Sequence, residues 1–327
     1  GGFVSTVLDS VTGCAAHTIL WFEVANGTID LNIKMLRPVP KDENLIAEKN
    51  SIYPFTLLEG YLDEPLLLSR SKDNNIKCLS NVCTHRGNLL VLKPCKSATI
   101  RCTYHGRRFN SEGEFEFMPD FEKTKNFPRK CDNLNSFLVK SWNKLLFTAF
   151  NPIIDIEKVL EIMDKRIGFL PLNKAIFDSS LSQNFKIDAH WALYCDNYLE
   201  GFHVPFVHKD LNEILDYNSY ETEIYDHCNL QIGYSNNKED CFIFPENHID
   251  SGKNIAAYYF WIYPNMMFNF YPWGISINIV KPINLKLTEV EFISYVFDKT
   301  KLNKGASSDL NKVEKEDEFV VQNVQKG

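Results

Sequence analysis

The most informative absences in this 327-residue sequence concern membranes, secretion and nucleic acid. No uncharged apolar run reaches the ~18–20 residues that a membrane-spanning helix needs. The first basic residue is Lys34, so the N-terminal stretch lacks the basic segment that opens a secretory signal peptide. Lysine and arginine total 35 against 42 acidic residues, a net charge of −7 with no basic stripe. We therefore expect neither a membrane nor a nucleic-acid partner.

Two short motifs combine cysteine with histidine. The first is Cys83-x-His85 and the second is Cys102-x-x-His105, with sixteen residues (86–101) between them. Two thiolates and two imidazoles are the ligand set of a Rieske-type [2Fe–2S] cluster, in which one iron takes both cysteines and the other both histidines. A tetrahedral zinc site could use the same residues, but zinc-finger spacing places two cysteines before two histidines. The spacing therefore favours the cluster over zinc, and over four unconnected residues.

The other seven cysteines are scattered and lie mostly in apolar stretches, as buried free thiols do. They bring the total to nine, an odd number that does not suit a complete disulfide framework. Disulfides are also rare in reducing compartments. We therefore expect a cytoplasmic protein whose free thiols are Cys14, Cys78, Cys95, Cys131, Cys195, Cys228 and Cys241.

A second candidate metal site lies further along, in an apolar segment with two histidines spaced H-x₄-H. On an ideal helix His203 and His208 would lie well apart, and Pro205 would disturb the helix between them. A distorted helix or a helix-to-loop exit would present both to one metal. Asp196 and Glu200 are spaced to share a helical face with His203, and acids in an apolar segment are costly unless they function. The alternative is a satisfied buried histidine beside a solvated acidic face.

The C-terminal stretch offers a carboxylate to complete such a site. Read as a helix, it has one apolar stripe formed by Val313, Val320, Val321 and Val324. Asp317 falls inside that stripe, whereas Glu316 lies at its edge and Glu318 well off it. Two histidines and one carboxylate form the facial triad of non-haem Fe(II), which leaves positions open for O₂. The alternative is a solvated acidic helix start, which accounts for Glu314, Glu316 and Glu318.

These motifs resemble the large subunits of Rieske ring-hydroxylating oxygenases. The flanks of the first site, 80–82 and 106–109, resemble that family's Rieske domain, except that Arg107 stands where tryptophan is common. Segment 191–208 resembles its mononuclear iron motif, which places the histidine ligands at His203 and His208. The family's bridging carboxylate falls on Glu200, where Asp is usual and Glu resembles the branch acting on carnitine-type substrates. The C-terminal segment resembles the family's ligand helix, with Asp317 as ligand.

Aromatic residues are dense between the two iron-binding segments, in 258–275. Alternation along strands would turn half of them into one pocket. Such a cage binds a quaternary ammonium group through cation–π attraction. The stretch resembles the choline, glycine-betaine and carnitine monooxygenase branch. A plain hydrophobic strand pair is the alternative, and an aromatic substrate would also fit.

Residues 1–48 have a different character. Their glycine pair, Asp9 and the strand-like run before Pro38 resemble the first half of a hotdog-fold (PaaI-type) acyl-CoA thioesterase, in which Asp9 would be the general base or nucleophile. Half a hotdog sheet cannot bury its own face. A fusion or gene-model remnant is therefore favoured over an active thioesterase.

Residues and resemblance together predict an α+β chain in which an all-β Rieske domain precedes a helix-grip catalytic domain, an antiparallel sheet with helices. We expect 1–48 to be the thioesterase-like segment, 49–150 the Rieske domain and 151–327 the catalytic domain. The family's ligand helix continues past the position of Gly327, so the catalytic domain is expected to be C-terminally incomplete.

The implied function is a mono- or dioxygenase component that uses Fe(II) and O₂ to hydroxylate a small organic substrate, either a quaternary amine or an aromatic acid. Glu200 is the expected bridging residue, and Asp196 is a second catalytic candidate. No G-x-G-x-x-G fingerprint occurs, so electrons would come ultimately from NAD(P)H through a separate reductase or ferredoxin. In this family neighbouring subunits supply the short path from cluster to iron, which implies a homotrimer. The alternatives are a Rieske protein that only transfers electrons and an acyl-CoA thioesterase acting through Asp9.

Overall fold

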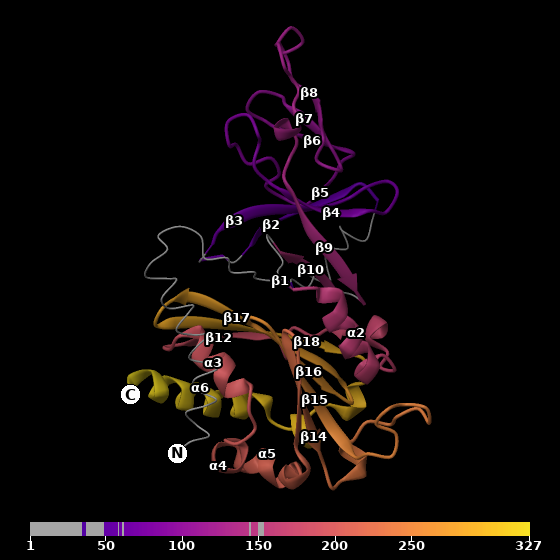
Figure 1. Cartoon of the computed structure of the whole chain (residues 1–327), viewed down its shortest axis with the longest axis vertical. Helices are drawn as coiled ribbons and strands as arrows, with labels where there is room; N and C mark the ends of the chain where they lie inside the picture. The colour runs from indigo at the N-terminus through magenta and orange to yellow at the C-terminus, as the bar shows by residue number, and fades with distance from the viewer. Residues whose placement is uncertain (1–34, 37–48, 58, 61, 144, 150–153) are drawn as a thin grey trace. The chain divides into compact units, whose positions relative to one another are not determined.

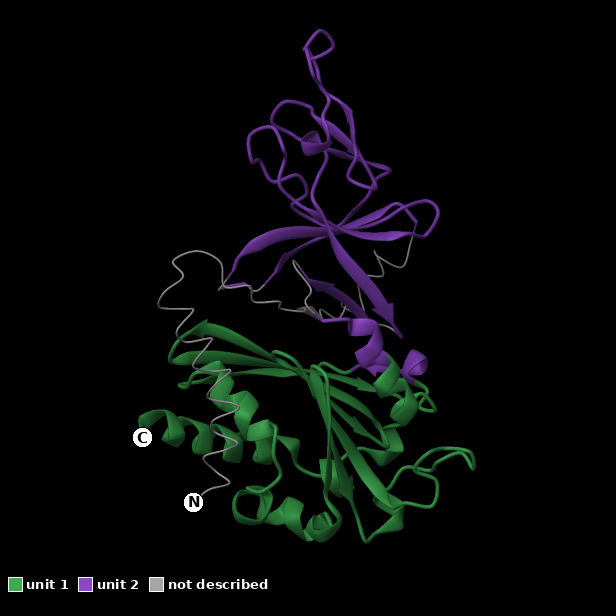
Figure 2. Ribbon diagram, in the orientation of Figure 1, with its two compact units in different colours: residues 1–33, 161–171, 178–327 green, residues 34–160, 172–177 purple. Residues whose placement is uncertain are grey.

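The computed structural model describes residues 35–36, 49–57, 59–60, 62–143, 145–149 and 154–327 (Figure 1). The chain divides into two compact units (Figure 2). The N-terminal unit takes in residues 34–160 and 172–177, and the C-terminal unit takes in the described residues of 161–171 and 178–327. No helix among the described residues is long and apolar enough to cross a membrane.

The N-terminal unit is built on antiparallel strands. Its larger sheet has the order β1-β10-β9-β4-β3-β2-β5, and a separate sheet has the order β6-β7-β8. The larger sheet consists of β1 (Met35–Leu36), β2 (Ser51–Leu57), β3 (Glu64–Arg70), β4 (Ile76–Ser80), β5 (Cys95–Lys96), β9 (Ser136–Trp142) and β10 (Leu145–Ala149). The smaller consists of β6 (Thr99–Arg101), β7 (Arg108–Asn110) and β8 (Phe115–Phe117).

Hydrophobic side chains from both sheets meet in one core. Period-2 alternation turns residues such as Leu67 and Leu79 inward, where both are fully buried. Ile100 and Phe109 face each other across the β6–β7 hairpin and join the same core. The motif cysteines Cys83 and Cys102 belong to it too. The loops that carry the candidate cluster ligands are therefore anchored by packed side chains.

The C-terminal unit contains a long antiparallel sheet. Its strands pair in the order β18-β17-β16-β15-β14-β13, and β12 pairs with β18. The strands are β12 (Gln183–Ile187), β13 (Glu221–Tyr225), β14 (Cys228–Tyr234), β15 (Ile255–Ile262), β16 (Met266–Tyr271), β17 (Gly274–Asn284) and β18 (Leu287–Val296). Short strand β11 (Ile176–Phe177) precedes them, and helix α2 (Ile156–Ile167) includes the boundary between the units.

Helices cover one face of this sheet. They are α3 (Trp191–Tyr198), α4 (Val204–Val207), α5 (Lys209–Ile214) and α6 (Leu310–Lys326). Tyr194 and Cys195 from α3 and Val321 from α6 pack against Met267 and Val280 of the sheet. The predicted α+β class, with helices held against an antiparallel sheet, is confirmed.

Candidate metal centres

The two cluster-motif loops are folded in the same way. In the first, Gly87 N–H donates to Cys83 C=O at 2.9 Å, and in the second Gly106 N–H donates to Cys102 C=O at 3.0 Å. Both glycines have positive φ, +70° and +72°, a conformation that side chains other than glycine rarely adopt. Each turn thereby places its cysteine at the base of the loop and its histidine near the tip.

The four side chains of these loops fit a [2Fe–2S] cluster. His85 and His105 have ring centroids 4.8 Å apart, in an edge-to-face arrangement. The Nδ1 atom of each is buried and makes no hydrogen bond within the part of the chain that the structure describes. A buried ring nitrogen without a partner is costly unless a metal takes it. Both cysteines are 2% exposed, so the four donors are shielded from solvent except near the loop tips.

The local electrostatics favour the metal-binding forms of Cys102 and His85, whereas burial raises the pKa of the Cys83 thiol. Burial works against the Cys102 thiolate, but backbone N–H groups of Tyr104 and His105 outweigh burial and lower the pKa of that thiol. Burial lowers the pKa of His85, and the neighbouring His105 ring adds to the effect. A thiolate and neutral imidazoles are the forms that bind iron.

Arg107, at the position where tryptophan is common, is buried beside this site. Its Nη2 donates to Asp132 Oδ1 at 2.6 Å, and its side chain is 2% exposed. The guanidinium carbon lies 5.0 Å from the ring centroid of Phe115 and 5.5 Å from that of Phe127. Arg107 is thus a buried cation that is held against aromatic faces and paired with a carboxylate.

The second centre is assembled where helix α3 ends. Its C-cap is Leu199, and the chain re-enters a helix only at α4, with His203 at the N-cap and His208 at the C-cap. Pro205 occupies the first turn of α4, where its missing N–H costs nothing. The predicted helix-to-loop exit is therefore present, and it lets residues five apart face one point.

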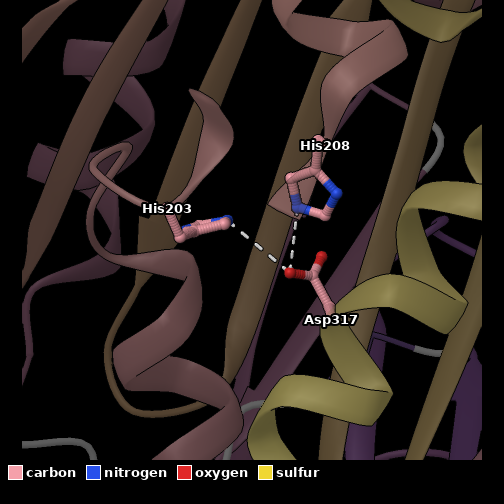
Figure 3. Close-up of side chains that lie close together, drawn as sticks. All are labelled: His203, His208 and Asp317. Carbon is pink, nitrogen blue, oxygen red and sulfur yellow. Dashed lines mark hydrogen bonds and ion pairs between the residues drawn. The ribbon is translucent and has the colours of Figure 1, made fainter. Parts of the chain in front are cut away.

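Three predicted ligands converge at this centre. His208 Nε2 lies 3.1 Å from Asp317 Oδ1, and His203 Nε2 lies 3.6 Å from the same oxygen. One donor atom from each of the three residues lies within 4.8 Å of the others, and the side chains point toward one another (Figure 3). This set of two imidazoles and one carboxylate suits a non-haem Fe(II) ion.

Further polar groups hold these side chains in position. Glu200 Oε1 is 2.7 Å from His203 Nδ1, and Glu316 Oε2 is 2.8 Å from His208 Nδ1. Asn197 Nδ2 donates to Asp317 Oδ1 at 2.6 Å. Burial works against a charged His208, yet the carboxylates of Asp317 and Glu316 outweigh it and raise the pKa of that imidazole. Carboxylates behind metal-binding histidines fix the ring orientation and increase its basicity.

Asp196 is placed differently from the prediction. We expected it to share one helical face with Glu200 and His203, but α3 ends at Tyr198 and both later residues lie beyond the helix. Asp196 does not line the pocket described below. Burial raises its pKa, and the Glu200 carboxylate adds to that rise. A catalytic role for Asp196 stays a prediction. Its carboxylate would act indirectly, through its electrostatic interaction with Glu200.

A cavity of about 100 Å³ adjoins the three candidate ligands. Five tyrosines contribute to its wall, and only two of them come from the aromatic stretch 258–275. Tyr194 and Tyr198 lie on α3, Tyr220 precedes β13, and Tyr259 and Tyr271 lie on β15 and β16. Among the described residues that line the cavity, none is lysine or arginine.

Some residues of this site were not predicted from the sequence. Glu314 was attributed to a solvated helix start, but it lines the cavity and accepts a hydrogen bond from Tyr194 Oη at 2.6 Å. Burial and the nearby Asp317 carboxylate raise the pKa of Glu314 well above its usual value. The inward face of α6 is consequently rotated from the predicted valine stripe, and Val324 is 57% exposed. Asn197 carried no signal in the sequence.

The N-terminal predictions cannot be compared with this geometry. Asp9 and the thioesterase-like residues before 35 lie outside the described residues.

Comparison with protein families identifies both parts of the chain. Residues 48–128 match the Rieske [2Fe-2S] domain, and residues 179–327 match the catalytic domain of the ring hydroxylating alpha subunit. The resemblance found in the motifs is thus confirmed. Together the two domains imply a [2Fe–2S] cluster and a mononuclear iron.

Related proteins point to the same architecture. Choline monooxygenase of Beta vulgaris is 27% identical over 296 residues, covering 86% of this chain and 63% of the relative. The carnitine monooxygenase oxygenase subunit of Escherichia coli K12 is 26% identical over 215 residues, covering 64% of this chain and 56% of the relative. The chain thus spans less than two thirds of the length of both.

Solved structures share the fold. The quaternary ammonium Rieske monooxygenase CntA in complex with L-carnitine superposes with a TM-score of 0.62 at 19% identity, covering 87% of this chain and 76% of that chain. Naphthalene 1,2-dioxygenase with indole bound superposes with a TM-score of 0.63 at 16% identity, covering 95% and 79%. Because residues 48–128 match the Rieske domain and residues 179–327 match the alpha-subunit catalytic domain, the chain belongs to the Rieske ring-hydroxylating oxygenase alpha-subunit family.

Proposed function

We propose that this chain is an oxygenase component that uses O₂ and electrons from a separate reductase to hydroxylate a small organic substrate. One observation carries the proposal: His203, His208 and Asp317 converge on one point and also line a cavity. Residues 49–150 form the electron-receiving domain in this proposal, and 151–327 form the catalytic domain.

The chemistry divides between the bound groups and the protein. Iron held by two histidines and a carboxylate keeps positions free for O₂, and a cluster with histidine ligands accepts electrons at a raised potential. Glu200 and Glu316 fix the two imidazole rings from behind, while Asn197 fixes Asp317. Glu200 sits at the ring nitrogen of His203 that faces away from Asp317, which suits the bridging role that the family resemblance implies.

The cavity wall favours a quaternary amine over an aromatic acid. Aromatic faces attract a trimethylammonium group, and carboxylates add to this attraction. An aromatic acid would need a cationic partner for its own carboxylate, and no described lining residue supplies one. The named activities of the relatives, choline and carnitine monooxygenase, agree with a quaternary amine.

The assembly we propose is a homotrimer in which the cluster of one subunit serves the iron of its neighbour. Exposed apolar side chains flank the iron-binding histidines: Phe202 is 64% exposed and Phe206 is 81% exposed. Leu89 and Tyr104, beside the cluster motifs, are also exposed. Apolar patches at both centres would be covered by subunit contacts. Light scattering after gel filtration tests this, and a monomer would contradict it.

We place the protein in a reducing compartment, the cytoplasm. All eight cysteines among the described residues are free, which supports this location.

Iron analysis and product detection together test the proposed function. The reconstituted chain should hold about three iron atoms, two in the cluster and one in the second centre. With reductase and O₂ it should release an aldehyde from a quaternary amine. His208→Ala should lower the content to about two iron atoms and abolish product, while the cluster absorbance remains. A content of about two iron atoms in the wild type would indicate a protein that only transfers electrons. Hydroxylation of arenes without oxidation of amines would overturn the proposed substrate class.

A further inference from the structure

We propose that Glu314 is the specificity-determining residue through which this pocket selects a small net cation over a zwitterion or a neutral molecule of the same shape. The inference rests on the function proposed above, since it concerns the substrate of the same pocket. The chemical class it points to is a trimethylammonium alcohol, or a related amine cation that lacks a carboxylate.

The position of Glu314 suits a counter-ion. It lies three residues before Asp317 on α6, and both side chains line the cavity together with Leu310 and Val313. Tyr194 Oη donates to Glu314 Oε2 at 2.6 Å and holds the carboxyl in one orientation. The other oxygen, Oε1, makes no hydrogen bond with any residue that the structure describes. One oxygen is therefore fixed and the other is left for a ligand.

The other acids of the pocket already have partners. Asp317 belongs to the candidate ligand set and accepts from Asn197, while Glu200 contacts the His203 ring and backbone. Glu314 is consequently the acid whose carboxyl group remains available to a substrate. A bound cation favours the charged form of this carboxyl and offsets the burial that raises its pKa.

The same wall disfavours a zwitterion. A betaine carries a carboxylate a few bonds from its trimethylammonium group, and in this cavity that carboxylate would meet acids without a lysine or arginine among the described lining residues. An unpaired charge in a desolvated site is strongly unfavourable. The tyrosine faces attract the ammonium group of both kinds of molecule, so they do not discriminate between them. Discrimination therefore falls to Glu314.

Calorimetric binding measures this selection without turnover. The full chain, loaded with cluster and iron and kept oxidised under anaerobic conditions, is titrated with three probes of similar size. They are choline, glycine betaine, which replaces the alcohol by a carboxylate, and 3,3-dimethylbutan-1-ol, the uncharged carbon analogue of choline. Choline should bind at least about tenfold more tightly than either of the others. Equal affinities for the three would overturn the proposal.

Two substitutions assign the selection to Glu314. Glu314→Gln keeps the size and an acceptor for Tyr194, and it should weaken choline binding about 10- to 100-fold while changing the neutral analogue by less than about twofold. Tyr194→Phe keeps the Glu314 carboxyl but removes the hydrogen bond that holds it in one orientation. It should therefore weaken choline binding by a smaller factor than Glu314→Gln does. Glu318→Gln is the matched control, because Glu318 is on the same helix but does not line the cavity; it should bind all three probes as the wild type does.

The outcomes separate this inference from the proposed function. Unchanged choline preference in Glu314→Gln, with circular dichroism and thermal unfolding like the wild type, would refute the role of Glu314 and leave amine oxidation standing. Equal weakening of the charged and the neutral probe would also refute it, since that pattern indicates a loss of shape. Selective binding of choline without any aldehyde release would instead remove the proposed activity and leave the role of Glu314 supported.

Discussion

Replacing Arg107 by methionine should destabilise the N-terminal unit by about 3–5 kcal/mol, the usual cost of breaking a buried ion pair by removing one partner. Arg107 is 2% exposed and its Nη2 lies 2.6 Å from Asp132 Oδ1, whose side chain is 11% exposed. Methionine keeps much of the apolar stem but leaves the Asp132 carboxylate with only the exposed Arg129 side chain as a cation, whose Nε lies 3.9 Å from Asp132 Oδ2. The Arg129 backbone N–H still donates to Asp132 Oδ2 at 2.7 Å, so the loss should fall near the lower end of the range.

A double-mutant cycle isolates the ion pair from the stacking. R107M also loses the cation–π contacts with Phe115 and Phe127, worth about 0.5–2 kcal/mol. D132N keeps those contacts but leaves the guanidinium unpaired. R107M/D132N removes both charges, so neither is left buried without its partner. The double variant should therefore be more stable than R107M alone, with a coupling energy of about 2–3 kcal/mol between the two sites.

Denaturant unfolding measures the cycle, with loss of the visible cluster absorbance reporting the N-terminal unit. R108M is the matched control, because Arg108 is 46% exposed and pairs with Glu116 at the surface. Its effect should stay within about 1 kcal/mol. A double variant less stable than R107M, or single effects that simply add, would refute the argument that Arg107 and Asp132 form one buried unit.

Three further predictions concern the C-terminal unit. Burial works against the Asp250 carboxylate, but hydrogen bonds from its neighbours, Arg166 among them, outweigh it and lower the pKa. The stabilisation from Asp250 is present above the unfolded value of about 3.9 and is lost as the pH falls through the lower folded pKa, so Asp250→Asn should flatten the decline of the unfolding temperature below about pH 5. Glu316→Gln should weaken iron binding about 10- to 100-fold by loosening His208, and unchanged iron affinity in a chelator competition would contradict this. Gly274→Ala should lower the free energy of unfolding by about 1–3 kcal/mol, because a Cβ atom there would lie 2.1 Å from the backbone oxygen of Tyr295 on the facing strand. An unfolding temperature equal to that of the wild type would show that the two strands can move apart at little cost.

Local spacing was sufficient to single out most residues of the two candidate metal sites. The pairs Cys83–His85 and Cys102–His105 each lie within one turn, so neighbouring residues determine how their side chains are presented. His203 and His208 needed one added inference, the exit from the helix before Pro205, and this was available from the geometry of an ideal helix. The fold class followed from the residues and the family resemblance together.

Tertiary packing decided the features that the sequence did not reveal. The inward face of α6 depends on where α3 lies against it, and Tyr194 meets Glu314 across 120 positions of the chain. Alternation predicted that half of the aromatic residues in 258–275 would share one pocket, and Tyr259 and Tyr271 of that stretch line the cavity. Tyr194, Tyr198 and Tyr220 reach the same cavity from other elements. The shared face expected for Asp196 failed because α3 ends at Tyr198, and propensity places helix ends poorly.

Helix α6 carries three acids within about one turn, and each serves a different partner. Glu314 faces the cavity, Glu316 holds His208, and Asp317 belongs to the candidate ligand set. A helix turn moves as a rigid body, so the cavity and the candidate metal centre share one mechanical support. By thermodynamic linkage, a cation that shifts this turn changes the iron affinity by the same factor as iron changes the affinity for the cation. The pocket and the metal centre are in this sense a single binding unit with two ligands.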